Sequence, residues 1–332
     1  MRRVLLRADG NSKIGTGHLH RIFALAQMLE SSFECVVIIQ SPSEDVLKLF
    51  EEKFRVIELK ASSKTSSEFY GELTPFVTAN DIVVLDGYHF DTDYQRHVKE
   101  KCYKLVSIDD IHQYHFLADL VINHSGGINP VFYFTESYTK LALGPKYCLV
   151  KKEFLETEKR KVFSYPPSVL INCGGADPSN HTKIILEKIN ACSDQFDMIH
   201  VILGAANMFR SEIEKIVEDW HLSKVKIHFG ISSCQMKNLM TECSVAVLSP
   251  STVLFEYCSI GGLVFLLQIA ENQKDVFHYF MSNKLAFDFE LVQDILKDEI
   301  SVNHHTKQSL LNQDNVFDHQ SGQRMLDLFL NL

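Results

Sequence analysis

The first residues whose types and spacing could take part in binding or catalysis lie in a glycine-rich stretch from Asp9 to Arg21. A glycine-rich turn that enters a helix lets a ligand approach the backbone. The stretch lacks the Lys-Ser/Thr pair of a Walker A loop, and His20 stands where a dinucleotide fingerprint needs glycine, so ATP and NAD are disfavoured. At the start of the following helix, the positive dipole end favours a neutral His18 imidazole that can act as a base. A plain surface histidine is the alternative.

A second glycine turn lies at Gly174 and Gly175, between an apolar run and a helical pattern. Its backbone N–H groups can lie against a phosphate, and we expect Ser179 or Asn180 to cap the helix that follows. A tight strand-to-helix turn without a ligand fits these residues equally well.

Hydroxyl, carboxylate and amide side chains follow the last apolar runs. Ser251 and Thr252 open a predicted helix, where an anion is favoured, and Glu256 one turn inside can accept hydrogen bonds from a ribose diol. An ordinary N-cap and a solvated helix face are the alternative interpretation. Further on, the amides of Asn272 and Gln273 can hold a sugar or a leaving oxygen.

Polar residues also follow apolar runs in the first half, at Asp86-Gly-Tyr88 and at Ser107-Ile-Asp109-Asp110. In a parallel sheet they lie at the same edge as His18. Asp109 and Asp110 would bind Mg²⁺ only with a third carboxylate from Asp9 or Asp86, so we expect no metal. A serine triad is unsupported, because the sequence has no G-x-S-x-G.

Short apolar runs rich in β-branched residues alternate with helical patterns along the chain, which predicts an α/β fold with buried parallel strands. The predicted strands of the first half are Val4–Leu6, Val36–Ile39, Val56–Leu59, Ile82–Leu85, Leu105–Ile108 and Leu120–Ile122. Those of the second half are Val169–Asn172, His200–Leu203, Lys226–Phe229, Val245–Leu248 and Val264–Leu267. A helix is also expected over Glu68–Thr78, and another over Arg324–Leu330.

The pattern stops between the two series, at Gly144-Pro145, a charged run and Tyr165-Pro-Pro167. We therefore predict two doubly wound Rossmann-like domains, residues 1–145 and 168–332, joined by a linker over 146–167. Ligands of such folds lie at the carboxyl ends of the strands, so we expect the domains to face a cleft.

Composition excludes several classes of protein. The 332 residues are 45% hydrophobic and 23% charged, as in ordinary globular proteins, and the net charge is −9. That charge argues against nucleic acid or an anionic membrane as partner. The apolar runs are too short for a signal peptide or a membrane span, which predicts a cytoplasmic protein. The eight cysteines include no C-x-x-C pair and are expected to be reduced thiols.

Taken together and in order, these segments resemble a known family. The matching segments are Gly15-Thr-Gly-His18-Leu-His-Arg21, Asp86-Gly-Tyr88, Ser107-Ile-Asp-Asp110, Leu143-Gly-Pro-Lys-Tyr147, Lys152-Glu-Phe154, Cys173-Gly-Gly-Ala-Asp-Pro178 and Ser251-Thr-Val with Glu256 and Asn272-Gln273. They look like the motifs of the UDP-sugar hydrolases of pseudaminic acid biosynthesis, which release UDP from UDP-2,4-diacetamido-2,4,6-trideoxy-β-L-altropyranose.

The resemblance implies a glycosyltransferase B-type fold that holds UDP mainly in its C-terminal domain. It also implies inverting attack of water on the anomeric carbon, with neither a metal nor a cofactor. By motif, the catalytic residues would be His18 as general base, Tyr88 and Asn272. The residues that bind UDP and the sugar would be Gly15, Gly17, Arg21, Gly174, Gly175, Ser251, Thr252, Glu256 and Gln273.

One departure from the family pattern is Ser249-Pro250, where small or glycine residues are usual. The proline removes a backbone donor near the expected diphosphate. Two other functions remain open: a UDP-sugar-dependent glycosyltransferase of the same fold, and a sugar-nucleotide-binding protein without turnover.

Overall fold

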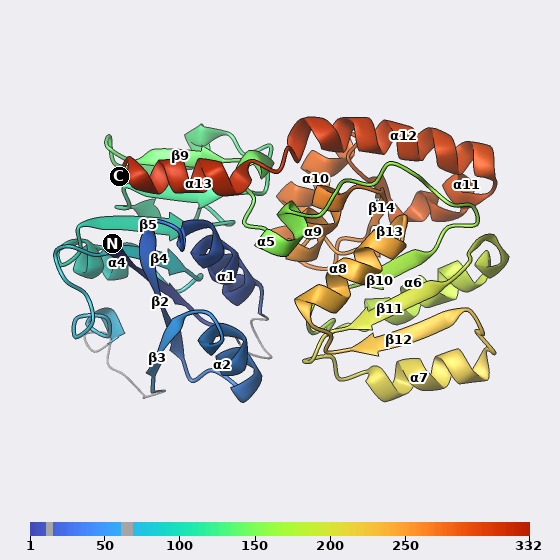
Figure 1. Cartoon of the computed structure of the whole chain (residues 1–332), viewed down its shortest axis with the longest axis horizontal. Coiled ribbons are helices and arrows are strands. Elements are labelled where there is room, and N and C mark those ends of the chain that lie inside the picture. Colours follow the sequence, from blue (N-terminus) through green and yellow to red (C-terminus); the bar gives the residue numbers. More distant parts are fainter. Residues whose placement is uncertain (11–15, 61–68) are drawn as a thin grey trace. The chain divides into compact units, whose positions relative to one another are not determined.

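The computed structural model describes residues 1–10, 16–60 and 69–332. The chain divides into two compact units, which are described separately (Figure 1). Unit 1 comprises Met1–Lys152 and Gln320–Leu332, and unit 2 comprises Glu153–His319. Each unit is a parallel sheet with helices against it, in agreement with the predicted fold class.

Unit 1 contains a seven-stranded sheet in the order β3-β2-β1-β4-β5-β7-β9, with all neighbours parallel. The strands are β1 (Arg2–Ala8), β2 (Phe33–Gln40), β3 (Arg55–Leu59), β4 (Ile82–Asp86), β5 (Lys104–Ile108), β7 (Leu120–Asn123) and β9 (Lys140–Leu143). The helices are α1 (Gly17–Leu29), α2 (Glu44–Glu51), α4 (Thr92–Lys99) and α13 (Ser321–Leu330). A short pair, β6 (His115–Phe116) and β8 (Phe134–Thr135), lies apart from the sheet.

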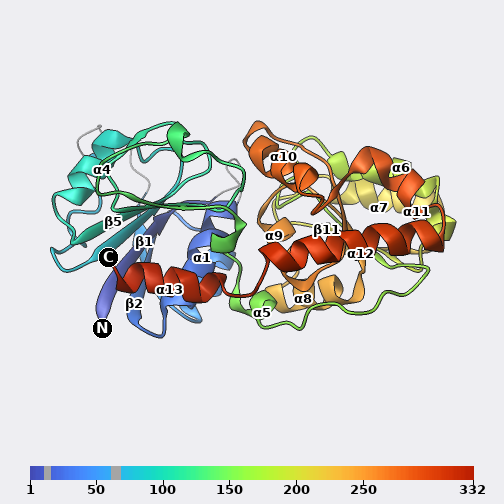
Figure 2. The same cartoon turned by 90° about the horizontal axis from the view of Figure 1, so that it is seen from above.

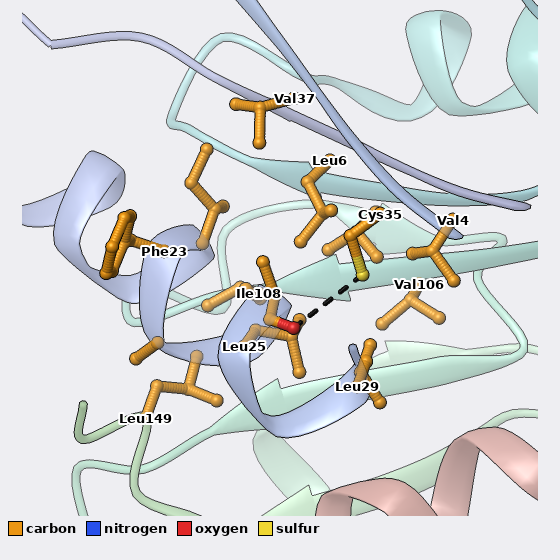
Figure 3. Packing of buried hydrophobic residues seen from close by; sticks show 14 of the residues in the cluster. Val4, Leu6, Phe23, Leu25, Leu29, Cys35, Val37, Val106, Ile108 and Leu149 are labelled. Atoms are coloured by element: carbon orange, nitrogen blue, oxygen red, sulfur yellow. Dashed lines mark hydrogen bonds between the residues drawn. The ribbon is translucent and has the colours of Figure 1, made fainter. Parts of the chain in front are cut away.

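The predicted strands of unit 1 agree closely with these bounds, whereas β9 was missed. In the helix predicted over Glu68–Thr78, Glu68 lies outside the described residues, and the described part is helical only at Phe69 and Tyr70. Most of that segment's described part is turn, because Gly71 and Pro75 interrupt the helical pattern. The apolar side chains that β1, β2 and α1 bury together form one face of the core (Figure 3). Within it the Cys35 thiol donates to the Ala26 carbonyl oxygen at 3.7 Å.

Unit 2 contains a six-stranded sheet in the order β12-β11-β10-β13-β14-β15. Its strands are β10 (Val169–Asn172), β11 (Ile199–Leu203), β12 (Val225–Phe229), β13 (Val245–Leu248), β14 (Leu263–Leu266) and β15 (Phe287–Asp288). Its helices include α6 (His181–Asn190), α7 (Arg210–Asp219), α8 (Ser233–Glu242), α9 (Thr252–Ile260), α10 (Lys274–Ser282), α11 (Val292–Leu296) and α12 (Glu299–Val316). A short helix, α5 (Lys152–Leu155), begins at the unit boundary.

The strand order reverses between β1 and β4 in unit 1 and between β10 and β13 in unit 2. In each unit the chain first adds strands on one side of the starting strand and then returns to add strands on the other. The loops at such a reversal diverge, and they leave a crevice at the carboxyl ends of the strands where ligands bind. The topology therefore singles out one edge of each sheet.

The last helix corrects the predicted domain of residues 168–332, because α13 packs on α1 of unit 1 (Figure 2). Met325 and Phe329 lie one helical turn apart and are buried in the same core cluster as α1. The Phe329 ring meets Phe33 edge-on at a centroid distance of 6.2 Å. The apolar stripe of α13 thus completes unit 1.

Residues 153–167 of the predicted linker belong to unit 2. Arg160 fixes them there, because its guanidinium donates to the carbonyl oxygens of Thr241 at 2.7 Å and Cys243 at 2.9 Å, near the end of α8. Its Nε also donates to the carbonyl oxygen of Gly261 at 3.0 Å. None of the helices in the described part of the chain has both the length and the apolar character needed to cross a membrane.

Candidate functional site

The centre of the candidate site in unit 1 is a histidine–aspartate pair. His18 lies in the first turn of α1, which follows β1, and Asp86 is the last residue of β4. Because β1 and β4 are neighbours at the reversal of the sheet, these residues meet at its edge. His18 Nδ1 lies 2.7 Å from Asp86 Oδ1, and the two residues are 6% and 0% exposed.

Arg21, one turn further along α1, binds the same carboxylate with two donors. Its Nε lies 3.0 Å from Asp86 Oδ2 and its Nη2 lies 2.6 Å from Oδ1. Burial acts to raise the pKa of Asp86, but Arg21 and His18 outweigh burial and hold that pKa below its ordinary value. Asp86 is therefore an anion at neutral pH.

The anion decides which nitrogen of His18 carries the proton. Nδ1 lies 2.7 Å from both Asp86 Oδ1 and Arg21 Nη2, so it can donate to the first or accept from the second. We assign the proton to Nδ1, because the buried carboxylate is a charge-assisted acceptor and Arg21 Nη2 can direct its own hydrogen to Asp86 Oδ1 at 2.6 Å. Nε2 then keeps its lone pair and can accept a proton, as a general base must.

Tyr88 and Asp110 extend the site beyond this pair. The Tyr88 ring lies edge-on to His18 at 4.9 Å, and its hydroxyl donates to Asp110 Oδ2 at 3.3 Å. Arg21 Nη1 donates to the same Asp110 oxygen at 2.8 Å, which links Asp110 to Asp86. Tyr114 donates its hydroxyl proton to the backbone oxygen of Tyr88 at 2.8 Å and so fixes that loop.

Asp109 has a different role from its neighbour. Its carboxylate accepts from the His112 N–H and from the Tyr133 hydroxyl, each at 2.8 Å, and so shapes the turn that presents Asp110. Burial raises the pKa of Asp109 in spite of these bonds. Asp9 instead contacts Arg7 and the Gln40 N–H. The Mg²⁺ alternative requires the carboxylates to meet at one point. The contacts of Asp9 and Asp109 instead direct these two carboxylates to different partners.

In unit 2, the two predicted ligand-binding loops lie next to each other at the reversal between β10 and β13. Gly174 adopts φ +83°, and its N–H donates to Asn172 Oδ1 at 3.0 Å. A Cβ on Gly174 would lie 3.8 Å from Ser249 Oγ, and one on Gly204 would lie 2.2 Å from the Gly175 carbonyl oxygen. The glycine turn, the β11–α7 loop and the loop after β13 are thus in close contact.

The cap of α6 corrects a prediction, because Asp177 occupies the role expected of Ser179 or Asn180. One Asp177 oxygen accepts from the His181 N–H at 2.8 Å, and the other accepts from the Thr182 N–H at 2.9 Å. Asn180 forms no side-chain cap bond. A carboxylate therefore already neutralises the start of α6, which makes that helix a poor phosphate site.

The start of α9 is different. Ser251 forms no side-chain cap bond, and its hydroxyl lies 3.3 Å from Ser249 Oγ. The N–H groups of Thr252 and Val253 have no acceptor within the described part of the chain. The first turn of α9 can accordingly bind an anion, and the predicted carboxylate, Glu256, lies one turn inside and is 6% exposed.

Four further residues were predicted to contact the substrate, and the structure places them differently: Gln273, Asn272, Gly17 and Gly15. Gln273 accepts from the Ile269 N–H at 2.9 Å through its side-chain oxygen, so that oxygen shapes the loop after β14. Asn272 is exposed in the same short helical turn. Gly17 begins α1 with open space where a Cβ would be. Gly15 lies outside the described residues.

The motifs alone did not single out Asp177 or the joint role of Arg21 with Asp86.

No known protein-family model matches the chain. It is 27% identical over 286 residues to the uncharacterized protein MJ1062 of Methanocaldococcus jannaschii, an alignment that covers 83% of this chain and 57% of that protein. The chain thus spans little more than half the length of this relative. It is also 24% identical over 263 residues to the UDP-2,4-diacetamido-2,4,6-trideoxy-β-L-altropyranose hydrolase of Campylobacter jejuni, covering 76% of this chain and 87% of the hydrolase.

Solved structures match nearly the whole chain. A glycosyltransferase from Rickettsia africae has a TM-score of 0.67 at 12% identity, covering 99% of this chain and 97% of its own. The Anabaena protein Alr3699/HepE, solved with UDP and glucose, has a TM-score of 0.64 at 11% identity, with 100% of both chains covered. The fold is of the glycosyltransferase B type. This confirms the fold that the motif resemblance implied, with a Rossmann-like domain in each unit.

Proposed function

We propose that this protein hydrolyses a UDP-2,4-diacetamido-2,4,6-trideoxyhexose at the anomeric carbon and releases UDP and the free sugar for pseudaminic acid biosynthesis. The observation that carries the proposal is the buried His18–Asp86 pair at the strand reversal of unit 1. The pair leaves His18 Nε2 available as a base. The similarity to the Campylobacter jejuni hydrolase supports the choice of substrate.

In the proposed reaction, His18 Nε2 takes a proton from water while the water oxygen forms a bond to the anomeric carbon. The bond between that carbon and the UDP oxygen breaks, and its electron pair leaves with UDP. Asp86 stabilises the imidazolium that forms. In-line attack opposite the leaving group inverts the anomeric centre in one step, without a covalent sugar–enzyme intermediate.

Unit 2 supplies the proposed UDP contacts. The first turn of α9, beginning at Ser251 and Thr252, would hold the diphosphate, and the turn at Gly174 and Gly175 lies beside it. Glu256 would accept hydrogen bonds from the ribose. The N–H groups of the first turn of α9 and the helix dipole can stabilise a leaving diphosphate without a metal ion, so excess EDTA should leave turnover unchanged.

The first test follows the oxygen atom. The protein is incubated in ¹⁸O-labelled water with UDP-2,4-diacetamido-2,4,6-trideoxy-β-L-altropyranose, and mass spectrometry locates the label. We expect it in the sugar, with unlabelled UDP and the inverted anomer in early NMR spectra. His18→Asn should slow release by about 10²-fold or more, because the base is lost.

The exposed His97 on α4 provides the matched control, and His97→Asn should release UDP at the normal rate. Label in the phosphate, or UMP and sugar phosphate as products, would contradict the proposal. Transfer of the sugar to an added acceptor in preference to water would favour the glycosyltransferase alternative. Binding of the UDP-sugar without any UDP release would favour the non-catalytic one.

The second test separates UDP binding from chemistry. Calorimetric titration of UDP should show weaker binding to Glu256→Ala, which loses the proposed ribose contact, and normal binding to His18→Asn. A fall in affinity of about tenfold is expected for a lost charged hydrogen bond. Equal weakening in both variants would contradict the assignment of UDP to unit 2.

A further inference from the structure

A small pocket in unit 1 lies beside the His18 pair, at the carboxyl ends of β4 and β5. His18, Arg21 and Tyr88 line it together with Asp109 and Asp110. Apolar side chains form much of the remaining wall, and these are Leu85, Phe90, Ile108, Ile111 and Phe116. The pocket is therefore an apolar recess whose polar groups are those of the proposed catalytic site.

Two oxygen atoms of the pocket residues have unmet hydrogen-bonding capacity. Ser107, which also lines the pocket, is only 4% exposed, and its Oγ has no hydrogen-bond partner among the described residues. Asp110 uses Oδ2 for Arg21 and Tyr88, whereas its buried Oδ1 has no partner in the same part of the chain. Buried polar atoms are normally satisfied, so a ligand that can both donate and accept is expected here.

The pocket is large enough for a water molecule. Its volume is about 20 Å³. A site needs roughly 10–15 Å³ measured in this way to hold one water molecule, together with two or more polar partners. The recess therefore has room for a water molecule.

We infer that this pocket holds the water molecule that attacks the sugar, with Ser107 Oγ and Asp110 Oδ1 as its hydrogen-bond partners. The inference rests on the proposed function and deepens it, because it makes Ser107 a determinant of water as the acceptor. Ser107 and Asp110 orient the water, and His18 Nε2 receives its proton as the oxygen bonds to the anomeric carbon. The other product is UDP, which leaves with the electron pair of the broken bond.

The first test is a high-resolution crystal structure of the wild-type protein. We expect an ordered water molecule within about 3.2 Å of both oxygens, which is the outer limit of an ordinary hydrogen bond. The structure of Ser107→Ala should lose this water or show it displaced. A dry pocket in the wild-type protein would overturn the inference, and this readout does not depend on activity.

The second test measures how the acceptor is chosen. With the UDP-sugar named above and methanol added, Ser107→Ala should release free sugar about fivefold more slowly, because the water loses one partner. The methyl group of methanol can occupy the space that Oγ leaves, so the share of methyl glycoside should rise above the wild-type share. Ser107→Thr adds a methyl group to the recess and should also slow hydrolysis. UDP affinity should stay within about twofold in both variants, since they leave unit 2 unchanged.

Ser244 provides a matched control, because it is a 2% exposed serine in unit 2 whose Oγ also has no partner among the described residues. Ser244→Ala should keep the wild-type rate and product ratio. A wild-type rate and ratio in Ser107→Ala would overturn the inference while leaving the hydrolase intact. Absence of UDP release from the wild-type protein would instead overturn the proposed function, and with it the catalytic role of the pocket water.

Discussion

Asp86 determines what His18 can do, and its contribution can be separated from that of the histidine itself. In Asp86→Asn, the amide can donate to Nδ1, which moves the imidazole proton to Nε2 and removes the basic lone pair. We expect turnover to fall by about 10²-fold with KM little changed. ¹⁵N chemical shifts of His18 should report a protonated Nδ1 in the wild-type protein and an unprotonated one in the variant.

Thermal unfolding provides the necessary comparison, because Asp86→Asn also removes an anion that Arg21 binds at 2.6 Å and 3.0 Å. A variant with reduced turnover but an unchanged ¹⁵N pattern would show that Asp86 acts only through stability. The proposed positioning role would then be wrong.

At the scale of residues, the sequence predicted that His18 lies at the start of a helix, because it follows a glycine turn and begins a helical pattern, which is a local signal. It also predicted that Asp86 and Asp110 lie at the same sheet edge. It could not predict their separate partners, because the bonds from Arg21 to both carboxylates depend on the side-chain rotamers of three elements. The unmet capacity of Ser107 is likewise invisible in sequence, since it depends on what fails to reach the hydroxyl.

The cap of α6 gives a test at the scale of one element. Asp177 is buried and binds two backbone N–H groups and the Thr182 hydroxyl. Asp177→Ala should therefore reduce the free energy of unfolding by about 2 kcal/mol, the upper end for a lost cap. Ser179→Ala is the control, because Ser179 is exposed and should change stability by less than about 0.5 kcal/mol.

Urea unfolding followed by the circular dichroism of both variants measures these effects. Equal losses would mean that the carboxylate is no more than a surface group. The sequence favoured Ser179 or Asn180 because they stand directly before the helical pattern. The structure uses Asp177 instead, since Asp177 and Asn180 both adopt positive φ and this turn directs the aspartate side chain back over the helix start.

Element prediction succeeded where burial alone decides the pattern. Strands β4, β10 and β13 are buried along their length because helices cover both faces of each sheet, and such apolar runs are readily recognised in sequence. The last helix shows the limit of the method. Its apolar stripe predicted that α13 packs on something, but an amphipathic pattern does not say which sheet it covers.

The placement of α13 gives a test at the scale of the whole molecule. Phe329 is 1% exposed in the core of unit 1, whereas the neighbouring Leu330 is 59% exposed. Phe329→Ala should destabilise unit 1 by about 3–5 kcal/mol through the cavity it leaves. Leu330→Ala should cost less than about 0.5 kcal/mol.

Hydrogen exchange resolved by peptide shows where the loss falls. Amides of α1 and β2 should exchange faster in Phe329→Ala, and those of unit 2 should exchange as in the wild-type protein. Faster exchange in unit 2 alone would mean that α13 belongs with the second sheet, as the sequence had indicated.

The same arrangement orders events during synthesis. Unit 2 is a continuous stretch, Glu153–His319, so every strand and helix of its core has been translated before α13 is made. The whole sheet of unit 1 is translated much earlier, but the apolar side chains of α1 are fully covered only when Met325 and Phe329 have been made. Until α13 is made, a growing chain therefore exposes apolar side chains that this helix covers in the folded unit, a surface of the kind that chaperones protect from aggregation.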